Sequence, residues 1–167
     1  MSTELVIAEK PSTAAELAKA LGGFTRHPGY FERPGTLITH ARGHLVTLVG
    51  SPDHDPGWDL SRLPFIPQPF VVAPTDGKGD EALLGTIERL ARRPDISKLV
   101  NACDAGREGE LIFRLIVLYL GIQKPVERIW MQSMTPTGIR QAFQNRRTDA
   151  QMRALADAAR SRAEADW

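Results

Sequence analysis

Short apolar runs alternate with amphipathic segments along this chain, and this alternation constrains the fold more than any other feature. The run at residues 4–8 leads into an amphipathic stretch that begins near Pro11 and stops before Gly22. Proline favours the first turn of a helix and glycine its end. The same order recurs at 98–103, where the following stretch stops at Gly121. Strands that alternate with helices predict an α/β domain with a mainly parallel central sheet flanked by helices.

The other segments fit the same class. Residues 51–74 contain six of the twelve prolines, so we expect an irregular excursion there. The remaining predicted elements are a hairpin over 30–49 with its turn at Pro34-Gly35, a helix over 80–93, a helix over 107–120 with Leu111, Ile112, Leu115, Leu118 and Tyr119 inward, a strand over 126–131, a helix from Pro136 to about Phe143 and a C-terminal helix over 149–167.

Composition narrows the class of protein. A chain of 167 residues with 42% apolar residues can bury a proper core, and its net charge of +1 means that any basic surface must be local. Cys103 is the only cysteine, so no disulfide can form within the chain. The N-terminus lacks the basic region of a signal peptide, and no run is long enough to cross a membrane. We therefore expect a cytoplasmic protein with no membrane partner.

Acidic residues follow two of the predicted strands. Glu9 comes directly after the first, Asp104 comes after the strand at 98–103, and Glu108 lies one helical turn further on. If the two strands are neighbours in a parallel sheet, these carboxylates meet at its carboxyl edge, where ligands bind in open α/β sheets. Clustered carboxylates repel each other unless a cation holds them, and Mg²⁺ prefers such oxygen ligands. The pattern therefore predicts a Mg²⁺ site formed by Glu9, Asp104 and Glu108.

A structural interpretation of the stretch DAGREGE stays open when it is taken alone. Asp104 can cap a helix, and Glu108 and Glu110 can favour the positive end of the helix dipole. Glu9, at the equivalent end of another strand and followed by Lys10, favours the functional interpretation. The glycines at 106 and 109 also permit close approach of a backbone or a phosphate.

Taken together, AEKPS and DAGREGELIFR resemble the Toprim domain of type IA DNA topoisomerases, and specifically the bacterial topoisomerase III branch. Four further stretches agree with this resemblance: GHLVTL, WDLSRLPFIP, SMTPTGIRQAF and SRAEADW. The resemblance covers essentially the whole chain. It implies a Rossmann-like Toprim fold and a Mg²⁺-dependent enzyme that cuts one DNA strand through a 5′-phosphotyrosine, passes another strand and reseals the break.

The resemblance also implies roles for individual residues. Glu9 matches the Toprim glutamate at the scissile phosphate, and Lys10 matches the lysine that contacts this phosphate. Asp104 and Glu108 match the first and last acids of the family's Asp-x-Asp-x-Glu motif, so both are expected to be catalytic and metal-binding. The middle acid of that motif is Gly106 here. This departure favours one ion held by Glu9 and Asp104, with Glu108 acting directly or through water.

Partners follow from the same resemblance. We expect DNA, chiefly single-stranded, and the remaining topoisomerase domains as partners. A zinc site at His40 and His44 is not expected, because a third ligand is missing. His44 and Trp58 are candidate DNA contacts, although a structural role is at least as strong an interpretation for each. The full set of expected DNA-binding residues is Lys10, His44, Trp58, Arg107, Arg160, Arg162 and Asp166.

The predicted domain limits are 3–145 for the Toprim domain and 149–167 for the first helix of a truncated topoisomerase IA catalytic region. The family's nucleophilic tyrosine lies well beyond Trp167. Tyr30, in the predicted hairpin, and Tyr119, on a predicted core face, do not fit that role. We therefore expect a fragment that is inactive alone.

Two alternative functions remain. One is a stand-alone Toprim protein, such as a Mg²⁺-dependent nuclease or primase-like module; SRAEADW argues against it, because that segment resembles the topoisomerase helix. The other is a non-catalytic module that binds nucleic acid or protein.

Overall fold

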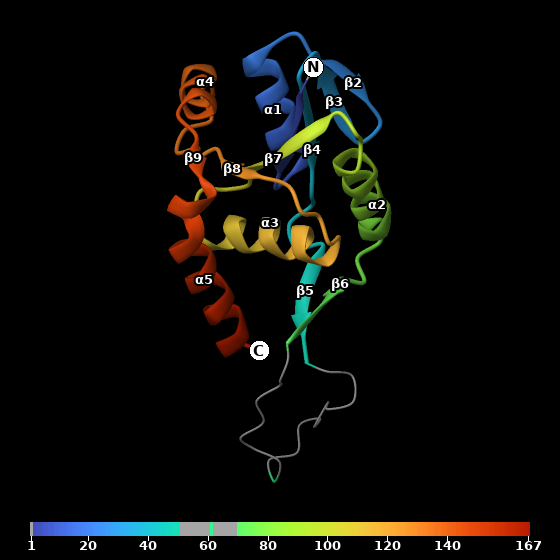
Figure 1. The fold of residues 1–167 in the computed structure, drawn as a ribbon, viewed down its shortest axis with the longest axis vertical. Helices are drawn as coiled ribbons and strands as arrows, with labels where there is room; N and C mark the ends of the chain where they lie inside the picture. The colour runs from blue at the N-terminus through green and yellow to red at the C-terminus, as the bar shows by residue number, and fades with distance from the viewer. Residues whose placement is uncertain (1, 51–60, 62–69) are drawn as a thin grey trace.

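A seven-stranded sheet in the order β2-β3-β4-β1-β7-β8-β9 runs through the centre of the fold in the computed structural model (Figure 1), which describes residues 2–50, 61 and 70–167. A second sheet pairs β5 with β6. The strands are β1 (Thr3–Ala8), β2 (Thr25–His27), β3 (Tyr30–Arg33), β4 (Thr36–His40), β5 (Val46–Val49), β6 (Val71–Pro74), β7 (Ile96–Ala102), β8 (Val126–Arg128) and β9 (Arg147–Thr148). The helices are α1 (Pro11–Leu21), α2 (Asp80–Ala91), α3 (Arg107–Tyr119), α4 (Pro136–Gln144) and α5 (Asp149–Ala165).

The four central strands are parallel. β1 lies between β4 and β7, and the register places Ala8 beside both His40 and Ala102. β8 adds to the other side of β7, also in parallel. The outer strands β2, β3 and β9 are antiparallel additions. The expected mainly parallel sheet is confirmed, and so is the condition that the two strands followed by acids are neighbours.

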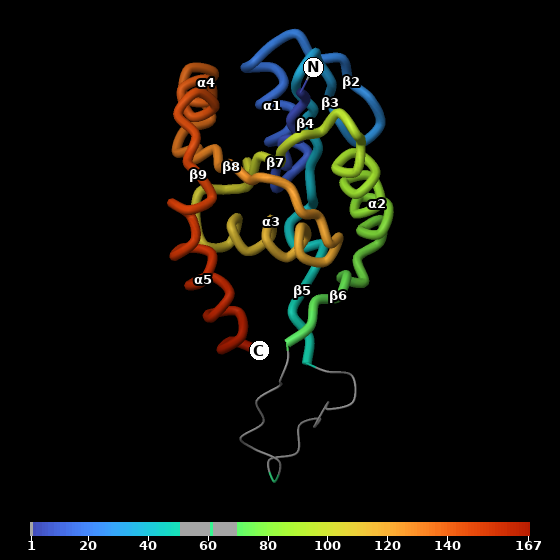
Figure 2. Tube along the Cα trace, in the orientation of Figure 1, coloured from blue at the N-terminus to red at the C-terminus, as the bar shows by residue number. Residues whose placement is uncertain are grey.

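Helices cover both faces of this sheet. Alternate residues of β1 point to opposite sides, so that Leu5 and Ile7 pack with α2 and α3, whereas Val6 and Ala8 pack with α1 and α4. α5 then packs against α3, as Figure 2 shows, and forms an outer layer on that side. None of the helices in the described residues is long and apolar enough to cross a membrane.

Local sequence signals set the ends of several helices. Gly22 ends α1 with a φ of 71°, a backbone conformation that residues other than glycine rarely adopt. The Thr135 side chain accepts a 3.2 Å hydrogen bond from the Gly138 N–H at the start of α4. Thr148 and Gln151 form a capping box at the start of α5. α5 therefore begins where the sequence predicted it, although it ends at Ala165.

The predicted hairpin is only partly correct. β3 and β4 pair around Pro34-Gly35 as expected, but β4 ends at His40 rather than continuing to Val49. β5 instead pairs with β6 in the separate sheet, so the end of the predicted excursion at residues 71–74 is a strand. Strands β2 and β9 lacked any sequence prediction, because segments of two or three residues show no periodicity. The rest of the predicted excursion, at 51–60 and 62–69, lies outside the described residues.

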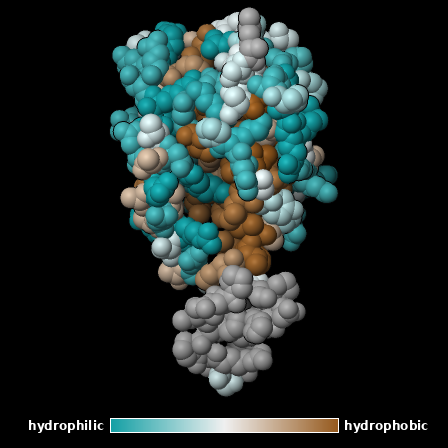
Figure 3. All heavy atoms as spheres, in the orientation of Figure 1, coloured by the Kyte–Doolittle hydropathy of each residue, from teal (hydrophilic) through white to brown (hydrophobic). Residues whose placement is uncertain are grey.

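The predicted inner face of α3 was also partly wrong. Leu118 and Tyr119 are 51% and 40% exposed, whereas Phe113 and Ile116 are buried. Leu111, Leu115 and Leu118 lie along a groove between α3 and α5, and Ile112, Phe113 and Ile116 belong to the core against the sheet. The helix therefore has two apolar stripes. Its last turn is only partly buried by the neighbouring elements. Figure 3 shows apolar residues exposed over α3 and the paired strands β5 and β6.

Candidate active site at the carboxyl ends of β1 and β7

Glu9 and Asp104 meet at the carboxyl ends of two adjacent parallel strands. The Asp104 N–H donates a 3.1 Å hydrogen bond to Oε2 of Glu9. Lys10 Nζ lies 3.2 Å from Glu9 Oε1 and 3.1 Å from Asp104 Oδ2, so its ammonium bridges the two carboxylates. Glu9 is buried, whereas the side chains of Lys10 and Asp104 are about half exposed. One basic and two acidic groups thus form a compact cluster open to solvent.

The charges in this cluster stabilise each other. The hydrogen bond to Asp104, followed by the one to Glu9, raises the pKa of Lys10 above its usual value. Lys10 therefore remains an ammonium at neutral pH. A single ammonium thus lies between two carboxyl groups.

The side-chain contact found for Glu108 is with a residue outside this cluster. Its carboxylate contacts Nε2 of His44, which follows β4. Glu108 extends from the first turn of α3 and its side chain is 68% exposed. Within residues 2–50, 61 and 70–167, no group of three or more His, Cys, Asp or Glu side chains is placed to hold a metal ion. The predicted grouping of three acids around one ion therefore stays a prediction.

The donor chemistry of Glu9 and Asp104 nevertheless suits Mg²⁺. Both supply hard carboxylate oxygens, and the exposure of Asp104 leaves room for the waters that Mg²⁺ usually retains. Their common partner is a single ammonium, whose place another cation can take. Glu108 contacts His44 through Oε1 alone.

The two glycines of DAGREGE, Gly106 and Gly109, differ in how closely their surroundings approach them. A Cβ on Gly109 would lie 2.1 Å from the carbonyl oxygen of Asp104, so glycine is needed for α3 to approach the loop. This confirms the expected close backbone approach. A Cβ on Gly106 would meet nothing within 4 Å, and its φ of 166° is extended backbone that any residue adopts. Packing in this structure does not require glycine at 106.

The predicted DNA-binding residues fall into separate groups. Arg107 and Arg162 line a groove of about 150 Å³ between α3 and α5, together with Glu108 and Asp166. His44 lines an adjoining groove that also includes Asp166. Arg160 instead lines a second groove between α3 and α5, the one that contains Leu115 and Leu118, and it pairs with Glu164 at 2.7 Å. Trp58 lies outside the described residues.

Sequence reasoning missed a polar network beneath the site. Arg128, at the end of β8, is buried and contacts Asn101, Glu110 and the loop that carries Asp104. The only signal was that Arg128 lies within the predicted strand VERIWM, which is a weak indication by itself because Glu127 is also charged. Glu110 is 1% exposed and belongs to this network, whereas the sequence suggested only a helix-dipole role for it.

Comparisons with known proteins point to one family. The sequence model of the Toprim domain matches residues 4–134. DNA topoisomerase 3 of Bacillus subtilis is 39% identical over 172 residues, which cover 100% of this chain and 23% of that protein. DNA topoisomerase 3 of Staphylococcus aureus strain USA300 is 39% identical over 166 residues, 98% of this chain and 23% of that protein.

A solved structure agrees with these relatives. The full-length topoisomerase I of Thermotoga maritima superposes with a TM-score of 0.54 and 25% sequence identity, covering 86% of this chain and 21% of that one. The chain thus spans less than a quarter of the length of the relatives that it matches.

Proposed function

Because this chain belongs to the Toprim family, we propose that it supplies the Mg²⁺-binding Toprim part of a type IA DNA topoisomerase of the topoisomerase 3 kind. The observation that carries this proposal is the cluster of Glu9, Lys10 and Asp104 at the carboxyl ends of β1 and β7. In the proposed reaction a tyrosine outside this chain loses its hydroxyl proton to solvent and attacks a phosphodiester. The P–O3′ bond breaks, a 5′-phosphotyrosine forms, and the reverse reaction reseals the strand.

The chain's own residues are assigned to charge and proton transfer. Lys10 places a point charge beside the acids, where it can hold a non-bridging phosphate oxygen. Glu9 is placed to give a proton to the departing 3′ oxygen and to recover it on resealing. Glu9 and Asp104, with Glu108 as a further candidate, would hold Mg²⁺, which when bound neutralises and orients the phosphate.

DNA would approach along the groove between α3 and α5. Arg107 and Arg162 provide positive charge on its two sides, and Asp166 lies 3.2 Å from Arg162, where it can orient the guanidinium. These contacts would bind backbone phosphates, which position a strand without reading its sequence. We extend this role to His44, Lys10 and Arg160, and we assign Trp58 a stacking contact with a base. We infer a preference for single strands from the family resemblance.

A chimaeric enzyme tests this function directly. The chain would replace the matching segment of the Bacillus subtilis DNA topoisomerase 3, to which it is 39% identical. We expect the chimaera to relax supercoiled plasmid in Mg²⁺ and to lose cleavage and resealing together in Glu9→Ala. A matched Glu16→Ala change on the exposed side of α1 should leave activity intact. A folded chimaera whose activity is unaffected by Glu9→Ala would contradict the proposal.

The isolated chain separates this proposal from a stand-alone nuclease. A carboxylate site can in principle activate water, which the nuclease alternative requires. The pure chain would be incubated with plasmid and single-stranded oligonucleotide in Mg²⁺ and in Mn²⁺. We expect intact substrate in every sample. Cleavage that disappears in Glu9→Ala and Asp104→Ala would favour the nuclease.

A further inference from the structure

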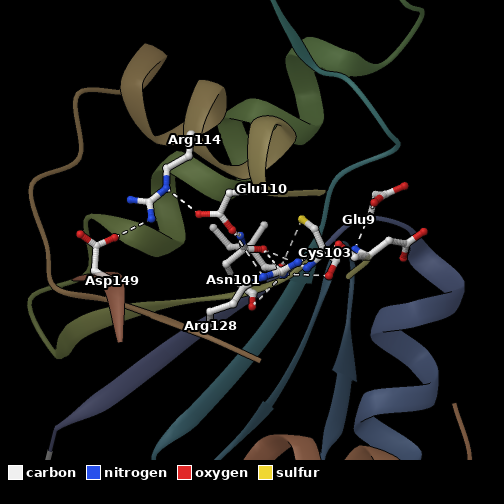
Figure 4. Close-up of polar contacts among 9 residues, drawn as sticks. Glu9, Asn101, Cys103, Glu110, Arg114, Arg128 and Asp149 are labelled. Carbon is white, nitrogen blue, oxygen red and sulfur yellow. Dashed lines mark hydrogen bonds and ion pairs between the residues drawn. The ribbon is translucent and has the colours of Figure 1, made fainter. Parts of the chain in front are cut away.

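Arg128 is a charged residue in the core of the fold. It is 1% exposed and lies at the end of β8, next to β7 in the sheet. Figure 4 shows its guanidinium between Asn101 and Cys103, with Glu110 and Arg114 on one side and Glu9 on the other. A buried charge requires hydrogen-bond or ion-pair partners. The partners of Arg128 indicate which part of the fold it holds.

Most of these partners belong to the loop that leaves β7. Nη1 donates to the carbonyl oxygen of Cys103 at 2.8 Å and to Oδ1 of Asn101 at 2.7 Å. Nη2 donates to the carbonyl oxygen of Asp104 at 2.7 Å. One planar guanidinium therefore holds two consecutive backbone carbonyls. Lysine cannot reproduce this arrangement, because its ammonium is a single point of charge.

The position of Asp104 depends on these bonds. Its carbonyl oxygen is held from one side by Arg128 and is closely approached by Gly109 on α3. Its N–H is directed at Glu9, and its side chain contacts Lys10. Arg128 touches none of the reacting groups directly, so any effect on them passes through the Asp104 backbone.

Acidic residues compensate the buried charge. Glu110 is the nearest buried carboxylate, with Oε2 at 3.4 Å from Nε of Arg128 and at 3.1 Å from Nδ2 of Asn101. Its other oxygen accepts from Arg114, which also pairs with Asp149 at 2.5 Å. Two arginines and two acids thus form a connected set of ion pairs. Burial lowers the pKa of Arg128, and the charge of Glu110 opposes this shift.

We propose that Arg128 is a positioning residue of the candidate active site, whose guanidinium holds the carbonyls of Cys103 and Asp104 and so fixes Asp104 against Glu9 and Lys10. This inference rests on the proposed function, because positioning is meaningful only if that cluster acts. It adds a requirement: the site needs the planar donor of Arg128, in addition to the acids themselves.

The first test uses the unaltered chain. At low temperature, NMR should resolve separate Nη–H signals for Arg128, with a through-hydrogen-bond coupling to the Asp104 carbonyl. A single averaged signal from a freely rotating guanidinium would overturn the proposal. This measurement requires no variant, so it holds even if substitutions at 128 prevent folding.

The second test compares Arg128→Lys with Ile129→Val, which removes a methylene from the neighbouring buried residue. In Arg128→Lys, amide exchange at Asp104 should accelerate about tenfold relative to the β1 amides, and Mg²⁺ affinity should fall roughly 10- to 100-fold. Ile129→Val should lower the melting temperature without either change. An Asp104 amide that is unaffected in Arg128→Lys would overturn the proposal.

The two measurements separate this inference from the proposed function. Amide exchange and guanidinium signals need no metal, so they decide the role of Arg128 even in a chain that fails to bind Mg²⁺. Such a failure would count against the proposed function alone.

Discussion

The main-chain N–H of Asp104 donates a 3.1 Å hydrogen bond to the carboxylate of Glu9, 95 positions earlier in the sequence. This bond joins the carboxyl ends of β7 and β1 and makes the two strand ends one site. Lys10 reinforces it by contacting both acids. Substitutions at the end of β1 or of β7 should therefore both affect Mg²⁺ binding.

Asp104→Ala should abolish Mg²⁺ binding by the isolated chain. Binding in the unaltered chain is expected to be weak, because Mg²⁺ is usually held by one or two carboxylates together with substrate phosphate. Titration calorimetry and NMR shifts at Glu9 would measure it. Asp157→Ala, which removes an acid on α5 away from the cluster, is the matched control. The same Mg²⁺ response in the unaltered chain and in Asp104→Ala would rule out this site.

Gly106→Asp should strengthen Mg²⁺ binding by roughly tenfold, since ligand charge is a main determinant of affinity in oxygen-ligand sites. The residue lies between Asp104 and Glu108, a Cβ there would meet nothing within 4 Å, and its backbone is extended. Gly106→Asn has similar size without the charge and serves as control. Equal affinities for the two variants would show that an acid at 106 does not reach the metal.

Gly109→Ala should destabilise the chain by about 1–3 kcal/mol, because the new methyl group would overlap the carbonyl oxygen of Asp104. Gly85→Ala, inside α2 with nothing within 4 Å, should instead stabilise by about 0.5–1 kcal/mol. Urea unfolding would measure both. A neutral Gly109→Ala would mean that the α3–loop contact is looser than in this structure.

Asp80 should make stability depend on acid pH. Its buried carboxylate accepts from Thr75 at 2.8 Å and Arg42 at 2.6 Å, and the Thr75 hydrogen bond, followed by Arg42, lowers its pKa below the usual 3.8. The folded state therefore binds this proton more weakly than the unfolded state. The stabilisation is present above pH 3.8 and is lost as pH falls through the folded pKa.

Unfolding of Asp80→Asn across this pH range provides the check. The variant should be less stable than the unaltered chain at neutral pH, and the difference should shrink as the pH falls below the ordinary carboxyl range. A difference that stays constant with pH would show that the Asp80 charge does not contribute.

Local patterns predicted the parts of the fold that depend on periodicity and caps. The parallel arrangement and the meeting of Glu9 with Asp104 followed from alternating elements and strand ends. Pairing between distant segments was harder to predict: β5 joins β6 rather than extending the hairpin, because that choice depends on tertiary contacts. Arg128 escaped prediction for the same reason, since its acceptors lie on β7 and in the loop that follows it.

Single-stranded DNA should bind the isolated chain weakly and with strong salt dependence. Arg107 and Arg162 line one groove, and a net charge of +1 adds no long-range attraction. Removing the side chain that binds one phosphate should reduce the slope of log K against log salt by about 0.7. Arg107→Ala and Arg162→Ala should each show this reduction, whereas Arg92→Ala at the end of α2 should not. Fluorescence anisotropy at several salt concentrations would measure the slopes, and tight binding that persists at high salt would contradict a phosphate-based interface.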